Sequence, residues 1–207
     1  MPTSYVVHSL NADEREFLVF GLQWSVVIGH RSDKEALSRA RDAKATHYLP
    51  PGSHSSVVGY VTFTGEKKDK GKQLSTWFSA AQIFADYHPK GVHYLLLELG
   101  DEKHWLVAAQ DGEVIPGTDQ VFFSKEDALD AVESLREQHS AAIQGNDVKF
   151  NAPSPASRMV AIRHPLMALP LWMRLSLAGV AAIAILGQGF DLIDGLMTGG
   201  KGRHQAE

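Results

Sequence analysis

The chain has 207 residues, a formal net charge of −4 at pH 7 and no cysteine. This length accommodates one soluble domain with a real hydrophobic core and one further segment. The charge gives no reason to expect a nucleic acid partner, and the missing cysteine excludes disulfides, thiolate metal sites and a cysteine nucleophile.

The N-terminal region reads as β structure. Tyr5–Val7 is a short apolar run, and residues 16–28 follow after a polar break. The second run is rich in β-branched and aromatic residues, which predicts one long strand or two short ones bent at Gly21.

A helix and a central strand follow. Ser32 is expected to cap a helix that runs to about Ala43, with Glu35 in the third position of a capping box. Two prolines at positions 50 and 51 break the chain. Residues 57–63 then form a strand with apolar side chains on both faces, which predicts a central position in a sheet.

The next segment combines a charged loop with a predicted helix. Residues 65–73 resemble a phosphate-binding loop, but five residues instead of four separate the glycines, and Gln73 stands where Ser or Thr is required. A solvated surface loop is therefore the better interpretation. Residues 74–87 have apolar side chains at helical spacing and predict one helix.

The clearest supersecondary signal is a hairpin of residues 93–99 and 104–110. A turn at Asp111-Gly112 follows and returns the chain into a short strand. Residues 125–138 then predict a helix capped by Ser124. The pattern predicts an α+β, mixed-sheet domain over residues 1–144.

The C-terminal part predicts a membrane anchor. Residues 145–169 lose periodicity and carry three prolines, with Pro170 directly after them, which indicates a juxtamembrane linker, and residues 193–207 form a short tail. Between Arg174 and Asp191 lie sixteen residues without a charge, so residues 170–192 are expected to form one transmembrane helix if Arg174 extends its side chain to the headgroups. A buried core helix is the alternative.

Several residues define the character of this span. Trp172 suits an interfacial anchor, and Ala178 with Ala182 forms a small-xxx-small pair for close helix contact. Basic residues are in excess upstream, which predicts a single-pass protein with its N-terminal domain in the cytoplasm. The residues that we assign to the span are Leu171, Trp172, Arg174, Ala178, Ala182, Leu186 and Phe190.

The sequence offers no motif for catalysis, and we expect no catalytic residue, cofactor or metal. A metal site would need His88, His93 and His104 to meet in space, although no pair has the spacing of a helical zinc motif. A small-ligand sensor, tethered to the membrane, is the alternative function. It requires a pocket lined by several of Trp77, Tyr87, His88 and His104.

Two passages carry a family resemblance. Residues 17–24, with Gly21-Leu22-Gln23-Trp24, resemble the Gly-Leu-x-Trp element of PilO-type pilin accessory proteins from type IVb pilus operons. Residues 104–119 are similar to that family's Trp-apolar-Ala-x-x-Asp-Gly-x-Ile-x-Pro-Gly-x-Asp stretch. The motif residues, which we expect to be structural, are Gly21, Trp24, Trp105, Asp111, Gly112, Pro116, Gly117 and Asp119.

The resemblance implies a non-enzymatic scaffold in the bacterial inner membrane. Such a protein belongs to a type IVb pilus or a related pilus or secretion assembly platform. Its cytoplasmic domain is expected to be a truncated actin-like fold without nucleotide chemistry. It would link an assembly ATPase or a polytopic platform protein to the membrane ring, as a homo-oligomer or ring component. Members of that family carry a sizeable periplasmic domain after the span, whereas this sequence ends at Glu207.

Overall fold

The computed structural model describes residues 5–11, 15–28, 32–52, 56–64, 75–145 and 148–162, all within the unit Met1–Ile162. The predicted span, the tail and the charged loop 65–73 lie outside the described residues. No helix in the described part of the chain is long and apolar enough to cross a membrane.

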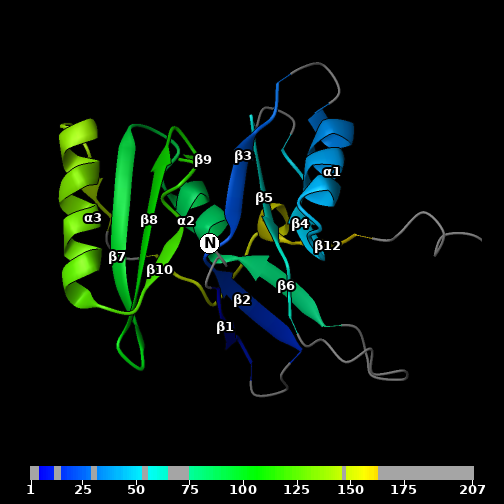
Figure 1. The fold of residues 1–207 in the computed structure, drawn as a ribbon, viewed down its shortest axis with the longest axis horizontal. Coiled ribbons are helices and arrows are strands. Elements are labelled where there is room, and N and C mark those ends of the chain that lie inside the picture. Colours follow the sequence, from blue (N-terminus) through cyan, green and yellow to red (C-terminus); the bar gives the residue numbers. More distant parts are fainter. Residues whose placement is uncertain are drawn as a thin grey trace, which may run out of the picture. The chain divides into compact units, whose positions relative to one another are not determined.

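Three sheets form the framework (Figure 1). In the first, β2 (Glu16–Phe20) lies between antiparallel β1 (Val6–Ser9) and parallel β6 (Thr76–Ser79). The second is antiparallel and has the order β12 (Val160–Ala161), β4 (His47–Leu49), β5 (Val57–Val61), β3 (Gln23–Val26). The third has the order β10 (Gln120–Phe122), β8 (Lys103–Gln110), β7 (Val92–Gly100), β11 (Ile143–Gln144), and β9 (Glu113–Val114) pairs with the end of β8.

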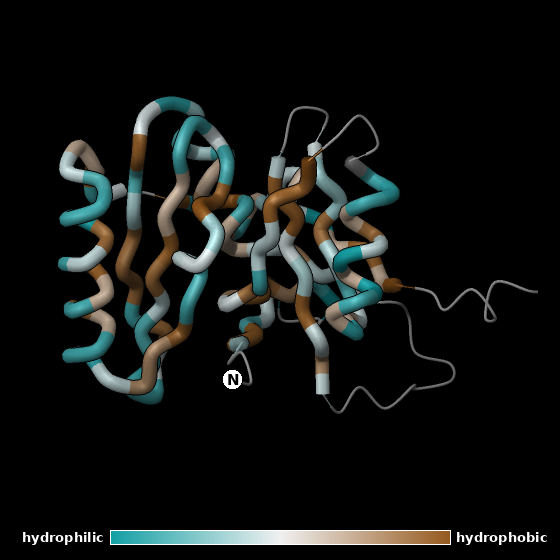
Figure 2. The backbone as a smooth tube through the Cα atoms, turned by 45° about the horizontal axis from the view of Figure 1, so that its top comes forward, coloured by the Kyte–Doolittle hydropathy of each residue, from teal (hydrophilic) through white to brown (hydrophobic). Residues whose placement is uncertain are grey.

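The helices cover the sheets from different sides. Helix α2 (Ala80–Tyr87) and helix α3 (Lys125–Gln138) contact β8, and Figure 1 shows them on opposite faces of the third sheet. Helix α1 (Ser32–Asp42) packs on β4 and β5 of the second sheet, and a 3₁₀ turn at Pro155–Ser157 contacts α2. Figure 2 shows hydrophobic residues along the strands and an alternation of hydrophilic and hydrophobic residues along α3. The main core therefore lies around α2, where Phe84 is fully buried.

The mixed α+β class is confirmed, and so are several elements. Helix α3 has the predicted bounds, and β7 and β8 form the predicted hairpin. Strand β5 lies between β3 and β4, as its two apolar faces predict. The arrangement does not establish the actin-like fold that the resemblance implies.

The predicted helix over residues 74–87 is wrong in its first part. Residues 76–79 form strand β6, which pairs with β2, and the helix begins only at Ala80. Ser79 ends the strand and caps the helix, because its Oγ accepts a hydrogen bond from the Gln82 N–H at 3.1 Å. Trp77 stacks on Phe17 of β2 at 4.7 Å, so tertiary pairing overrides the helical spacing.

Gly21 separates the two strands of the predicted run 16–28. Its φ of 84° suits glycine, and it lets the chain leave the first sheet and enter the second. The bend thus joins two sheets.

The predicted linker differs from the structure over residues 148–162. Met159 is 5% exposed in the main core, and β12 pairs with β4. The Ser154 hydroxyl donates a hydrogen bond to Asp86 of α2 at 2.6 Å. Prolines and strands of only two residues leave no periodic pattern, which explains why this packed segment reads as a linker.

Candidate functional site

A buried carboxylate joins the two passages that carry the sequence resemblance. Asp119 is 3% exposed and accepts four hydrogen bonds. Its Oδ1 accepts from the Gly21 N–H at 2.8 Å and the Trp105 indole N–H at 2.7 Å. Its Oδ2 accepts from the Leu22 N–H at 2.9 Å and the Trp24 indole N–H at 2.8 Å. We call these five residues the Asp119 cluster.

The electrostatics of the Asp119 cluster are a balance of two effects. Burial raises the pKa of the Asp119 carboxyl, because the charged form loses its hydration. The two indole N–H groups and the two backbone N–H groups oppose this rise by stabilising the carboxylate. All four contacts are made by donors of the chain itself, so this carboxylate connects β8 with the bend between β2 and β3.

The remaining motif residues form the turns on either side of β9. Asp111 and Gly112 have φ values of 51° and 85°, and the Asp111 carboxylate accepts the Gly91 N–H at 2.8 Å. Pro116 and Gly117 form the next turn, with φ of 85° at the glycine. Thr118 stabilises this turn, because its Oγ accepts a hydrogen bond from the Ala108 N–H at 2.9 Å. Asp119 follows these turns directly, and its side chain is buried in the domain.

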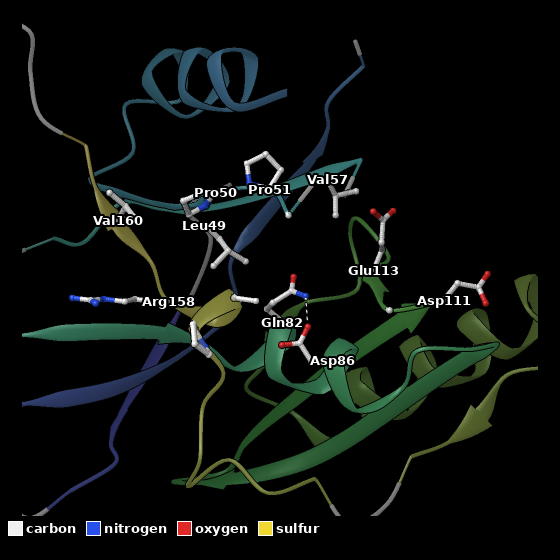
Figure 3. A pocket seen from close by; sticks show the side chains of 14 residues that line it. Leu49, Pro50, Pro51, Val57, Gln82, Asp86, Asp111, Glu113, Arg158 and Val160 are labelled. Atoms are coloured by element: carbon white, nitrogen blue, oxygen red, sulfur yellow. Dashed lines mark hydrogen bonds between the residues drawn. The ribbon is translucent and has the colours of Figure 1, made fainter. Parts of the chain in front are cut away.

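A groove of about 650 Å³ lies between the second sheet, α2 and the β8–β9 turn (Figure 3). Leu49, Val57 and three prolines supply apolar lining. Asp86, Asp111 and Glu113 supply carboxylates, and Arg158 supplies the one arginine among the lining residues. Figure 3 shows the Arg158 guanidinium directed away from the Asp86 and Asp111 carboxylates. We call this feature the acidic groove.

The carboxylates of the acidic groove are anchored by neutral donors. Asp86 accepts from the Gln82 amide at 2.8 Å and from Ser154, and both Glu113 oxygens accept from Ser56 at 2.7 Å. Within the described ranges, none of Asp86, Asp111 and Glu113 forms an ion pair with a lysine, arginine or histidine. Their negative charge is therefore fixed in position, and no cation of the described residues forms an ion pair with it.

Two of the three histidines of the hypothetical metal site meet. The rings of His88 and His93 stack at 4.3 Å and 15°. Burial, and then the neighbouring His93, lower the pKa of His88. The His88 Nε2 and His93 Nδ1 atoms are buried and have no hydrogen-bond partner among the described residues.

The third histidine lies elsewhere. His104 pairs with Glu98 across the hairpin, whereas His93 pairs with Ala109, which puts His104 about 17 Å further along the strands. In the part of the chain that the structure describes, no group of three or more His, Cys, Asp or Glu side chains is placed to hold a metal ion.

The residues proposed for a ligand-sensing pocket are not brought together. Trp77 packs in the core against Phe17 and Phe63, and Tyr87 is 44% exposed at the end of α2. Neither these two nor His88 and His104 line the acidic groove. The sequence indicates chain breaks or a linker at the lining prolines and a turn at Asp111-Gly112, and no local pattern shows that these segments face one another.

The comparisons with known proteins give a structural likeness but no family match. No protein-family model and no curated protein matches the sequence. A solved structure described as "Crystal structure of the cytoplasmic domain of BfpC" is similar at 17% sequence identity and a TM-score of 0.42. The match covers 76% of this chain and 93% of that chain. At this identity and TM-score, the likeness assigns neither a family nor a function.

Proposed function

We propose that this protein is a non-enzymatic scaffold of a type IVb pilus or a related pilus or secretion assembly platform. The segment 170–192 anchors it in the bacterial inner membrane, and residues 1–162 form its cytoplasmic domain. This domain binds an assembly ATPase or a polytopic platform protein and links it to the membrane ring.

The observation that supports the proposal is the contact between residues 17–24 and residues 104–119, the two passages that carry the family resemblance. Trp24 and Asp119 are separated by 95 residues in sequence but form a direct hydrogen bond. Gly21 and Trp105 bind the same carboxylate. Because residues of both passages converge on one buried group, the two passages form a single structural unit in this chain, which supports interpreting them together as one motif.

The described carboxylates favour a binding role over catalysis. Asp119 is saturated by four donors of the chain, and the groove carboxylates are held by Ser56, Gln82, Gly91 and Ser154. The three groove carboxylates, Asp86, Asp111 and Glu113, therefore present a stable charged surface, whereas Asp119 is buried. Such a surface suits recognition of a protein partner by complementary charge.

The experiment is affinity purification of the detergent-solubilised full chain from its native host, followed by mass spectrometry. We expect an assembly ATPase and a multi-span membrane protein to be recovered. A matched variant lacking residues 171–190 is expected to lose the multi-span protein, because its anchor is gone. Recovery of the full chain without either partner would contradict the scaffold role.

A further inference from the structure

The acidic groove and the lysine-rich segment of this chain carry opposite charges. The groove presents Asp86, Asp111 and Glu113 without a cation partner among the described residues. Residues 65–74 carry four lysines against two acids. Charge complementarity therefore makes this segment a suitable occupant of the groove.

The described chain enters the lysine-rich segment from the end of β5 that is remote from the groove. Val57, the first residue of β5, lines the groove, whereas the described chain leaves the other end of β5 through Thr64 and resumes at Ser75 (Figure 1). The five residues of β5 alone place its ends about 13 Å apart. A second copy satisfies the contact without requiring the segment to fold back along the strand that precedes it.

We propose that the acidic groove binds the lysine-rich segment 65–74 of a second copy of this chain, so that copies join head to tail. A contact between two different surfaces of identical chains builds a ring when its rotation closes. The inference rests on the proposed scaffold role, for which a ring of anchored copies is the natural platform. Surface ion pairs are individually weak, and confinement to a membrane raises the local concentration of the copies.

The chain offers a clean cross-linking test, because it contains no native cysteine. One full-length version carries K70C in the segment, and a second version with a different tag carries A156C in the groove. Ala156 lines the groove and is exposed. Both are co-expressed, and membranes are oxidised mildly and analysed for the mixed disulfide. The control pairs K70C with S140C, because Ser140 is exposed beyond the end of α3.

We expect at least about fivefold more mixed disulfide with A156C than with S140C. Replacing Asp86, Asp111 and Glu113 by Asn, Asn and Gln (D86N/D111N/E113Q) removes the charge and keeps one acceptor oxygen at each position. The new amide NH₂ groups at positions 86 and 113 can donate to the hydroxyl oxygens of Ser154 and Ser56. This change, or 0.5 M salt, is expected to reduce the product to the control level. Substituting the other lysines of the segment (K67Q/K68Q/K72Q) is expected to do the same, and it alters no described contact.

A mixed disulfide no more abundant than the S140C control would overturn the inference. So would a product that is unaffected by both sets of neutralising substitutions. The scaffold role is tested separately. If the mixed disulfide forms but the ATPase and the multi-span protein are not recovered, the scaffold role alone is refuted. If both proteins are recovered but the disulfide does not form, only the head-to-tail contact is refuted.

Discussion

The Asp119 cluster and the half-buried His88–His93 pair are two polar sites that differ in how their buried polar atoms are satisfied. Both Asp119 oxygens accept two hydrogen bonds each. In the histidine pair, one nitrogen of each ring is buried without a partner among the described residues. A satisfied network stabilises the connection between sheets, whereas unsatisfied buried groups make the packing at the end of α2 sensitive to protonation and to added volume.

The largest expected effect comes from D119N. The amide NH₂ of asparagine would face two N–H donors, which leaves these donors unsatisfied in a buried site. We expect the free energy of unfolding to fall by about 3–5 kcal/mol, measured by denaturant unfolding. D130N, at an exposed position of α3, is the matched control and should change the stability by less than about 0.5 kcal/mol. Equal stability of D119N and D130N would refute the structural role of the cluster.

W105F tests one donor of the same cluster. Trp105 is 0% exposed, and its ring contacts Phe20 edge to face at 4.9 Å. The substitution removes one hydrogen bond to a charged group and leaves a small cavity, so we expect a loss of about 2–4 kcal/mol in the free energy of unfolding. This loss is measured by calorimetric melting of W105F and of the wild type under the same conditions. A wild-type melting temperature would contradict the account.

G145A tests the histidine pair by added volume. A Cβ at position 145 would lie 2.8 Å from His88 Nε2 and 2.9 Å from Phe84 Cε2. Because Phe84 is fully buried and cannot easily move, we expect destabilisation by about 1–3 kcal/mol, measured by urea unfolding. G100A is the comparison, because no atom lies within 4 Å of its added Cβ, although its φ of +84° adds strain. Gly145 has no positive φ, so strain of that kind cannot explain a loss in G145A, and a G145A variant as stable as the wild type would contradict the crowding.

The smallest expected effect is a pH dependence of stability. His88 has a pKa below the ordinary value of 6.5, so the unfolded chain binds more protons than the folded chain as the pH falls below about 6.5. Its contribution to the free energy of unfolding is therefore complete above this pH and is lost progressively below it. Unfolding at pH 7.5 and 5.5 should show a smaller difference between the two pH values in H88Q than in the wild type. Equal stability differences between the two pH values in H88Q and the wild type would exclude His88 as a source of the pH dependence.

The sequence predicts the elements whose patterns are local. Helix α3 and the β7–β8 hairpin follow from periodicity and turn residues within short windows. Strand β6 was missed because Trp77 and Phe78 fit both a helical face and a strand, and only the pairing with β2 decides between them. The packing of residues 148–162 was missed because it depends on contacts with β4 and α2.

The same limit applies to the candidate site. The sequence singles out Gly21, Trp24, Trp105 and Asp119, but no local pattern pairs residues that lie 95 positions apart. The acidic groove was not predicted, because its lining comes from five separate stretches of chain. Its proline and aspartate residues are common in turns, so their presence in the sequence does not indicate that they line one groove.

The scaffold role is tested most directly by surface assembly in cells that lack this chain. Pilus fibres or secreted substrate are counted after complementation with the full chain and with a variant lacking residues 171–190. The account predicts that assembly is lost without the chain, returns with the full chain and does not return with the variant. Normal assembly in cells that lack the chain would contradict the proposed function.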